Sequence, residues 1–276
     1  MKKKERLDIL LVERGLIETR EKAKRAIMAG LVFSEQERLD KPGQKVDVEV
    51  PIELKGNPIP YVSRGGLKLE KALHSFNFDL NDKIMIDIGS STGGFTDCAL
   101  QNGAKFVYAV DVGYNQLAWK LRNDPRVQVM ERTNFRYSKP EDFSKGLPHV
   151  ATIDVSFISL KLILPVLKEI LLTGGRVVAL VKPQFEAGKE EVGKKGIIRD
   201  KKVHQAVIEK ITQFSHETGY HVIDCTHSPI RGGEGNIEFL LHLEKPQHDE
   251  AAEMKWSGDA KAIVAKAHES YKKEEK

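Results

Sequence analysis

The sequence has only two cysteines and no long apolar run among its 276 residues. Cys98 and Cys225 cannot supply a disulfide-stapled scaffold, and so few cysteines fit a reducing compartment. No uninterrupted apolar stretch approaches the roughly 20 residues that a membrane-spanning helix requires. Glu13 and Arg14 interrupt the one apolar segment near the start, so it does not resemble a secretory signal. We therefore expect a soluble protein of the cytoplasm.

The sequence also lacks a strong charge of one sign. Charged residues make up 30% of the chain, yet the formal net charge is only +4. Composition alone therefore does not identify a nucleic-acid-binding protein, and any basic surface must be local. The first thirty residues hold nine Lys or Arg against five Asp or Glu. The N-terminal part is thus where a basic surface is expected.

The N-terminal residues predict a small α+β module. Apolar residues recur at helical spacing in 6–14 and again in 19–29, which predicts two short helices. Thr19 stands where it can cap the second helix. A turn and the alternating run VDVEV (46–50) then predict a short β segment. We place this module at residues 1–56, followed by a proline-containing linker at 57–62.

The rest of the chain predicts an α/β domain at residues 63–245. Apolar strand candidates alternate with helical stretches, which is typical of a parallel sheet with helices on both faces. The last two strand candidates follow closely and predict an antiparallel hairpin at one edge of the sheet. We expect Trp119 to pack against this sheet, and residues 246–276 to form a charged extension with one exposed helix. The strand candidates are 83–89, 105–111, 127–131, 149–155, 176–182, 221–228 and 236–243.

A glycine-rich segment follows the first strand of this domain. Gly89, Gly93 and Gly94 in GSSTGG allow the backbone to turn tightly and to approach a ligand closely. About twenty residues later, Asp111 ends the second strand, where an acid can bind ribose hydroxyls. A nicotinamide enzyme is an alternative, but GSSTGG lacks the G-x-G-x-x-G spacing that suits a pyrophosphate. Asp87, just before the loop, suits a cationic amino-acid group better than a diphosphate.

Four charged residues stand where a parallel sheet usually presents its chemistry. Asp154 and Lys182 each end a strand, so both reach the carboxyl edge of the sheet, where ligands bind in open α/β folds. Lys68 lies in the helix before the first strand, and Glu238 interrupts an apolar strand. Each of the four alone is more often part of an ordinary ion pair. Their combination nevertheless predicts a functional site.

At this point the chain resembles a known family. From about residue 6 to 245 it is similar to the TlyA family, often called haemolysin A, whose N-terminal module is an S4-like RNA-binding domain. This resemblance implies an FtsJ-like ribose 2′-O-methyltransferase with a Rossmann-like class I methyltransferase sheet. One departure is Tyr61, where a known member has tryptophan. The motifs that carry the resemblance are SRGGLKL, DIGSSTGGFTD, DVGYNQLAWKLRNDPRV, ERTN, DVSFISL, LVKPQFEAGK and GNIEFLLHL.

The resemblance implies the site residues. A Lys-Asp-Lys-Glu catalytic tetrad falls on Lys68, Asp154, Lys182 and Glu238. The implied cofactor is S-adenosyl-L-methionine, and no metal is expected. For the cofactor we expect Asp87, Gly89, Ser90, Ser91, Thr92, Gly93, Gly94, Phe95, Asp111, Val112 and Asn134. For RNA we expect Arg6, Arg20, Lys22, Lys24, Arg25 and Arg64, although the basic helix among them could also be a solvated face.

The implied reaction is methylation of a cytidine ribose in ribosomal RNA of the large subunit, and for some members also of the small subunit. A ribose hydroxyl is a weak nucleophile, so a base must remove its proton. The hypothesis is that Lys182 is this base, oriented by Asp154, while Glu238 holds Lys68. Lys68 would lower the pKa of Lys182 or hold the target ribose.

Several points stay open in the sequence. The segment 188–202 is either a mobile lid or a charged surface loop. A membrane-active haemolysin and a catalytically silent RNA-binding assembly factor are alternative functions, with a DNA or small-molecule methyltransferase as a more distant one. We expect ribosomal RNA or ribosomal subunits as partners, no membrane and no stable protein partner. The chain itself is expected to be a monomer or a weak homodimer.

Overall fold

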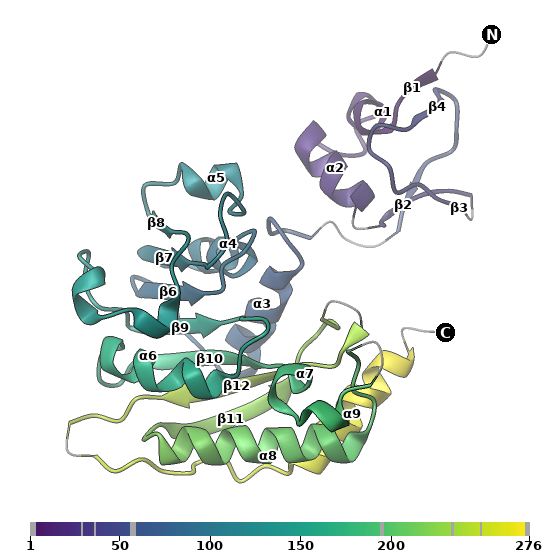
Figure 1. Ribbon diagram of the computed structural model, residues 1–276. Helices are drawn as coiled ribbons and strands as arrows, with labels where there is room; N and C mark the ends of the chain where they lie inside the picture. Colours follow the sequence, from purple (N-terminus) through teal and green to yellow (C-terminus); the bar gives the residue numbers. More distant parts are fainter. Residues whose placement is uncertain are drawn as a thin grey trace. The chain divides into compact units, whose positions relative to one another are not determined.

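The computed structural model describes residues 4–28, 30–35, 37–55, 59–193, 196–232, 235–248 and 250–273. The chain divides into two compact units, Met1–Pro60 and Tyr61–Lys276 (Figure 1). Each unit has an apolar core of its own.

The N-terminal unit packs two short helices against small β ribbons. Thr19 Oγ1 accepts the backbone N–H of Lys22 at 3.3 Å and so caps the second helix. Leu7 and Leu11 of the first helix and Ile27 of the second are fully buried. Their helical spacing places them on the sides of the two helices that face the common core. Strand β1 pairs with β4, and β2 pairs with β3 and β5. The elements are β1 (Lys4–Arg6), α1 (Leu7–Glu13), α2 (Arg20–Met28), β2 (Val32–Ser34), β3 (Glu37–Arg38), β4 (Lys45–Asp47) and β5 (Glu53–Leu54).

The larger unit is built on a seven-stranded sheet in the order β11-β12-β10-β9-β6-β7-β8. Neighbouring strands from β10 to β8 are parallel, whereas β12 is antiparallel to both β10 and β11. The predicted α/β sheet and its antiparallel edge hairpin are therefore confirmed. The strands are β6 (Ile84–Ile88), β7 (Phe106–Val110), β8 (Val127–Met130), β9 (Val150–Ile153), β10 (Arg176–Val181), β11 (His221–His227) and β12 (Phe239–Glu244).

Helices cover both faces of this sheet. In β6, Ile86 and Ile88 belong to the core that α6 and α8 share. Asp87 lies between them in sequence, so it points to the opposite face, where it bonds Thr96 of α4. The helices are α3 (Gly65–Ser75), α4 (Gly94–Gln101), α5 (Trp119–Arg122), α6 (Leu164–Ile170), α7 (Pro183–Glu186), α8 (Lys201–Glu217) and α9 (Ala260–Lys273). Short 3₁₀ turns are η1 (Phe135–Tyr137), η2 (Pro140–Asp142), η3 (Leu160–Leu162) and η4 (Lys189–Glu191).

Two expectations about packing were wrong. Trp119 does not pack on the sheet but is 77% exposed, because α5 is a single turn whose buried position is taken by Leu121. The C-terminal helix α9 is docked rather than exposed on all sides. Val264, Ala267 and Tyr271 recur at helical spacing and are buried, and α9 packs against α8 and β11. The hydroxyl of Tyr271 donates to the carbonyl of Ser228 at 2.6 Å.

These two aromatic residues give opposite stability predictions. Tyr271→Ala should lower the free energy of unfolding of the larger unit by about 3 kcal/mol or more, since it empties a buried site. Trp119→Ala should change it by less than about 0.5 kcal/mol, because the ring is mostly solvated. Urea unfolding followed by circular dichroism measures both. Equal losses for the two variants would contradict this account of α5 and α9.

Candidate active site

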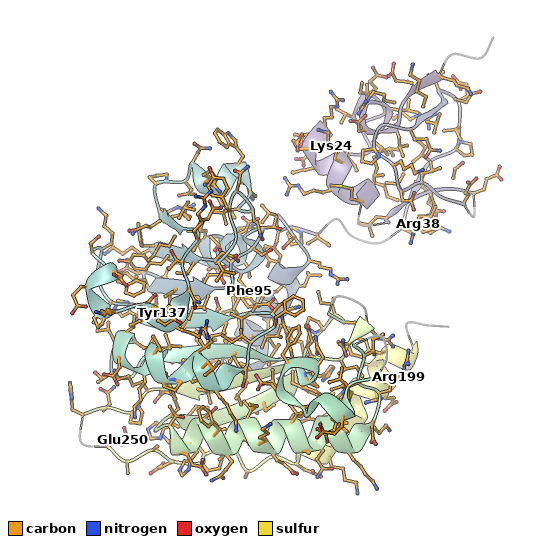
Figure 2. All side chains as sticks on the ribbon, viewed as in Figure 1. Lys24, Arg38, Phe95, Tyr137, Arg199 and Glu250 are labelled. Atoms are coloured by element: carbon orange, nitrogen blue, oxygen red, sulfur yellow. The ribbon has the colours of Figure 1, made fainter. Side chains whose placement is uncertain are left out.

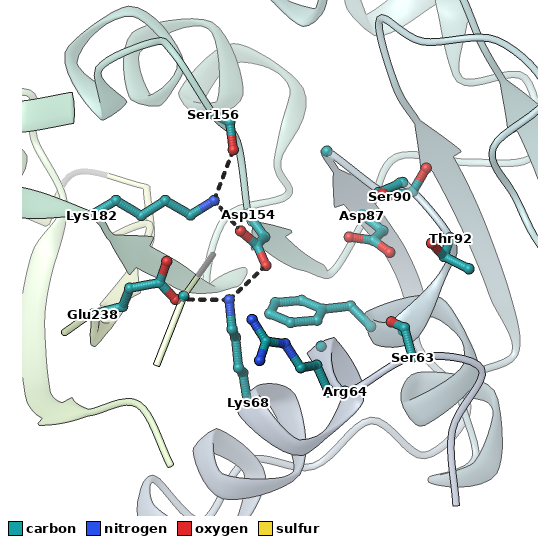
Figure 3. Close-up of a pocket in the computed structure, with 16 residues that line it drawn as sticks. Ser63, Arg64, Lys68, Asp87, Ser90, Thr92, Asp154, Ser156, Lys182 and Glu238 are labelled. Atoms are coloured by element: carbon teal, nitrogen blue, oxygen red, sulfur yellow. Dashed lines mark hydrogen bonds and ion pairs between the residues drawn. The ribbon is translucent and has the colours of Figure 1, made fainter. Parts of the chain in front are cut away.

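A hollow of about 250 Å³ opens at the carboxyl edge of the sheet (Figure 3). Its wall comes from the start of α3, the loop after β6, the ends of β9 and β10, and the segment before β12. The last of these reaches the same edge because β12 is antiparallel to β10. The lining residues are Ser63, Arg64, Gly65, Lys68, Asp87, Gly89, Ser90, Ser91, Thr92, Gly94, Phe95, Asp154, Ser156, Lys182, Gly232 and Glu238.

The four charged residues singled out in the sequence form one connected cluster in this wall. Asp154 lies between two lysines: its Oδ1 is 2.6 Å from Lys182 Nζ and its Oδ2 is 3.2 Å from Lys68 Nζ. Lys68 Nζ is also 2.8 Å from Glu238 Oε2. Residues as distant as 68 and 238 meet here because strand ends and the first turn of α3 converge on one edge. Two ammonium groups and two carboxylates thus alternate within ion-pair distance.

Three members of the cluster are almost fully removed from solvent, and the side chain of Asp154 is 20% exposed. Lys68, Lys182 and Glu238 are 7%, 8% and 2% exposed. Burial alone lowers the pKa of Lys68, but the charges of Asp154 and Glu238 outweigh it and hold that pKa above its ordinary value. Burial alone would raise the pKa of Asp154, but the positive charges of Lys68 and Lys182 outweigh burial and hold that pKa below its ordinary value. Lys68 therefore keeps its proton, and Asp154 stays ionised between the two lysines.

Ser156 is a site residue that the sequence reasoning missed. Lys182 Nζ donates to its Oγ at 3.2 Å, so the ammonium is held from two sides, by Asp154 and by Ser156. Ser156 stands two residues after Asp154 in the motif DVSFISL, and this position was the available signal. Ser63, Gly65 and Gly232 also line the hollow without having been predicted.

The loop after β6 is held close to β9. Gly89 has φ +87°, and a Cβ there would lie 2.4 Å from the carbonyl oxygen of Asp154, so only glycine fits. Asp87, just before the loop, is fully buried. It accepts hydrogen bonds from the Thr96 N–H at 3.1 Å, the Thr96 hydroxyl at 2.7 Å and the Thr152 hydroxyl at 3.1 Å. Burial nevertheless dominates and raises the pKa of Asp87 to about 7.

Asp111 anchors the same loop from the neighbouring strand. Its two carboxylate oxygens accept the backbone N–H groups of Ser91 at 2.8 Å and of Gly113 at 2.7 Å. Of the residues predicted to bind a cofactor, the hollow is lined by Asp87, Gly89, Ser90, Ser91, Thr92, Gly94 and Phe95. The other four, Gly93, Asp111, Val112 and Asn134, do not line it. Asn134 caps η1, where its Oδ1 accepts the N–H of Arg136 at 3.3 Å.

A second hollow lies beside the first. It measures about 440 Å³ and is lined by Arg136, Phe157, Ile158, Ser159, Leu162 and Phe185. Phe157 is 91% exposed and has φ +62°, an uncommon conformation for a bulky residue. Its ring lies 5.1 Å from that of Phe185, which in turn lies 5.9 Å from Lys182 Nζ. Tyr137, which is also exposed, directly follows Arg136 of this hollow on η1 (Figure 2).

The basic residues predicted for RNA divide into two groups. Arg64 is exposed and lines the first hollow. The others belong to the N-terminal unit, where Arg6 Nε and Arg20 Nε both contact the buried Asp8, at 2.9 and 2.8 Å. The hydrogen bonds from Arg6 lower the pKa of Asp8 to about 2.

Two of the lysines on α2 are also paired. Lys22 pairs with Glu18, and Lys24 Nζ lies 2.9 Å from Glu21 on the same unit (Figure 2). Arg25 is half-buried on the same helix. Part of the basic face is thus neutralised by its own carboxylates.

Two negative findings hold for the described ranges. Within them, no group of three His, Cys, Asp or Glu side chains has an arrangement that could hold a metal ion. No helix there has both the length and the apolar character needed to cross a membrane. Of the segment 188–202, residues 194–195 lie outside the described residues. Ile198 in its second half is buried, and its N–H donates to Asn236 Oδ1 at 3.0 Å.

Known proteins resemble the chain along nearly its whole length. A family model for FtsJ-like methyltransferases matches residues 61–245, and a model for the S4 domain matches residues 5–52. A Bacillus subtilis protein described as a candidate rRNA methyltransferase, YqxC, is 65% identical over 270 residues, covering 98% of this chain and 96% of that protein. The 16S/23S rRNA (cytidine-2'-O)-methyltransferase TlyA of Mycobacterium tuberculosis is 40% identical over 261 residues, covering 94% and 97%.

A solved structure also matches. It is described as a candidate hemolysin from Streptococcus thermophilus, with a TM-score of 0.80 and 57% sequence identity. The match covers 100% of this chain and 99% of that one.

The raised pKa of Asp87 predicts a pH-dependent stability. The folded state holds this proton more tightly than the unfolded state does, so the stabilisation is complete below pH about 4 and is lost as pH rises through about 7. Relative to Asp87→Asn, wild-type protein should lose about 1.4 kcal/mol of unfolding free energy per pH unit within that window. Urea unfolding of both proteins at pH 4.5, 5.5 and 6.5 gives the difference between their unfolding free energies at each pH, and this difference tests the prediction. Parallel curves for the two proteins would refute it.

Proposed function

This chain belongs to the TlyA family, in which an S4 domain precedes an FtsJ-like methyltransferase, and we propose from that premise that it methylates ribosomal RNA. The methyl donor is S-adenosyl-L-methionine, and the acceptor is the 2′-hydroxyl of a cytidine. The observation that carries the proposal is the pairing of Asp154 with two buried lysines, Lys68 and Lys182, in the wall of the first hollow.

The chemistry of the first hollow fits this cofactor. Its glycine loop offers backbone polar groups and the hydroxyls of Ser90 and Thr92. The carboxyl groups of Asp87 and Asp111 lie next to this loop. Acids and hydroxyls suit a cationic amino acid and a ribose, whereas a pyrophosphate would need basic groups or the glycine spacing of a dinucleotide fold. When bound, the cofactor supplies an activated methyl group that needs no further activation by the protein.

The protein must therefore align the ribose oxygen and remove its proton. Lys182 is the group that accepts this proton, because its Nζ is fixed between Asp154 and Ser156 in the wall of the first hollow. A lysine accepts a proton only when it is neutral. Lys68 does not accept this proton, because Asp154 and Glu238 raise its pKa and so keep it protonated. Lys68 instead supplies a fixed positive charge, which suits the oxygen of the target ribose or its phosphate.

The second hollow suits the base of the target nucleotide. An enzyme that acts on a ribose within folded RNA must turn the nucleotide out of its stack, and aromatic side chains commonly receive the base. Phe157 and Phe185 present two rings within reach of Lys182, and Arg136 brings hydrogen-bond donors to the same hollow. Arg64, exposed at the first hollow, suits the adjacent phosphate.

The N-terminal unit would supply RNA contacts of its own. Basic side chains on α2 and β1 suit phosphate contacts, which give salt-dependent affinity without reading sequence. The buried Asp8 fixes Arg6 and Arg20 side by side, while each guanidinium keeps other N–H groups for a phosphate.

The alternatives have weaker support. A catalytically silent RNA-binding factor has no use for a cluster of four charges, three of them buried, because such a cluster is costly to keep together. A membrane-lytic protein is suggested only by the names of relatives, among them the Hemolysin A of Brachyspira hyodysenteriae, which is 44% identical over 238 residues. Lysis of red cells by cofactor-free protein would favour it.

Lys182→Ala should lower the rate of methyl transfer to ribosomal subunits by about 10²- to 10⁴-fold, since the base is removed. Large and small subunits from cells that lack the gene are incubated separately with protein and radiolabelled S-adenosyl-L-methionine. Lys145→Ala, an exposed lysine outside both hollows, is the control and should keep wild-type rates. Near-normal transfer by Lys182→Ala would overturn the assignment of the base. An absence of label with wild-type protein on either subunit would count against the proposed function itself.

Lys22→Ala should weaken RNA binding several-fold and reduce the slope of log Kd against log salt by about 0.7 to 0.9, because one phosphate contact is lost. The control is Lys105→Ala. Lys105 is also an exposed lysine paired with one carboxylate, but it lies at the amino end of β7, away from the site. Filter binding to ribosomal RNA across potassium chloride concentrations measures both variants. The same loss in both would mean that the N-terminal helix has no special part in binding.

A further inference from the structure

Glu186 is a buried carboxylate that the chemistry described above does not use. It ends α7, four residues after Lys182, and is only 4% exposed. Its Oε2 accepts the hydroxyl of Ser159 at 2.5 Å, and its Oε1 accepts the N–H of Leu160 at 2.7 Å. Both partners lie on the segment that follows β9. The carboxylate therefore links the chain after β10 to the chain after β9.

The linked segment carries two features of the site. Residues 155–158 run between two fixed points, namely Asp154, whose N–H donates to Ile88 at 2.9 Å, and the Ser159–Leu160 pair held by Glu186. Within this short span, Ser156 accepts a hydrogen bond from Lys182, and Phe157 faces Phe185.

The conformation of Phe157 needs such an anchor. Its φ of +62° is unfavourable for a side chain of this size, and with 91% of the residue exposed, packing does not hold it there. Residues kept in such conformations depend on the surrounding structure to fix them. The hydrogen bonds to Glu186, together with the burial of Leu160 in the core, fix the far end of this loop.

We propose that Glu186 is a positioning residue for methyl transfer. It holds the 155–160 segment so that Ser156 meets Lys182 and Phe157 meets Phe185. The proposal rests on the proposed function, because both contacts serve the RNA nucleotide. Glu186 itself does not line either hollow, so it acts through the loop and touches no substrate.

The surroundings of Glu186 agree with a fixed structural link. Burial raises the pKa of its carboxyl group, and the hydrogen bonds from Ser159 and Leu160 partly offset this. The Nζ of Lys210, on α8, donates to the backbone carbonyl of Glu186 at 2.7 Å. The end of α7 is thus attached to α8 on one side and to the β9 loop on the other.

The test compares Glu186→Ala and Glu186→Gln. Alanine removes both hydrogen bonds, so kcat should fall about 10- to 100-fold, as expected when reacting groups are misplaced by an ångström or less. Glutamine can accept the Leu160 N–H and donate to the Ser159 hydroxyl, so it should keep kcat within about threefold of wild type. The Kd for S-adenosyl-L-methionine should stay within about twofold in both variants, because the cofactor loop lies on another strand.

Two further variants keep the test decisive. Ser159→Ala removes one of the two hydrogen bonds without emptying the Glu186 site, and it should lower kcat by less than Glu186→Ala does. Glu209→Ala removes an exposed carboxylate of α8 whose Oε1 accepts a hydrogen bond from Gln205 at 2.8 Å, and it should leave kcat unchanged. Thermal unfolding of all four proteins separates misplacement from loss of fold.

Hydrogen exchange of the peptide spanning 154–160 provides a readout that needs no RNA. Glu186→Ala should speed exchange there and leave exchange in β6 unchanged. Equal kcat in Glu186→Ala and wild type, or unchanged exchange in that peptide, would overturn the proposal. A loss of kcat that glutamine does not rescue would also contradict it. An absence of methyl transfer by wild-type protein would instead count against the proposed function, and the exchange measurement would still decide whether Glu186 holds the loop.

Discussion

The carboxylate of Asp154 lies between the ammonium groups of Lys68 and Lys182, and the arrangement of the site depends on these two ion pairs. Opposite charges alternate in this cluster, so loss of Asp154 would leave the buried Lys182 without an opposite neighbour, and loss of Lys68 would do the same to Glu238. The same pairing makes the two lysines different. Lys68 faces two carboxylates, whereas Lys182 shares one with it and turns toward the hydroxyl of Ser156.

The sheet explains how residues so far apart in sequence come together. Asp154 and Lys182 end neighbouring parallel strands, β9 and β10, and the antiparallel β12 begins at that same edge with Glu238 before it. The glycine loop after β6 adjoins this edge because Gly89 packs directly against the backbone of Asp154. Cofactor loop and charged cluster therefore share one wall, and movement of β9 relative to β6 would disturb both.

Much of this architecture could be predicted from the sequence. Strand periodicity indicated the sheet and its antiparallel edge, and strand-end charges marked Asp154 and Lys182. What the sequence could not show depends on three-dimensional packing. Trp119 looked like a core residue, but the single-turn α5 buries Leu121 instead. Ser156 was marked only by its place two residues after Asp154 in the motif DVSFISL. Glu186 acts through hydrogen bonds to a separate segment, and no local pattern distinguishes it from an ordinary polar residue.

The most direct test of the account is the position of the transferred methyl group. Ribosomal RNA treated with the protein and isotopically labelled S-adenosyl-L-methionine can be digested to nucleosides and analysed by mass spectrometry. A site built to take a proton from a ribose hydroxyl predicts that the label appears in 2′-O-methylcytidine. Label on a nucleobase would contradict it, because methylation of a base does not require the paired lysines to face a ribose oxygen.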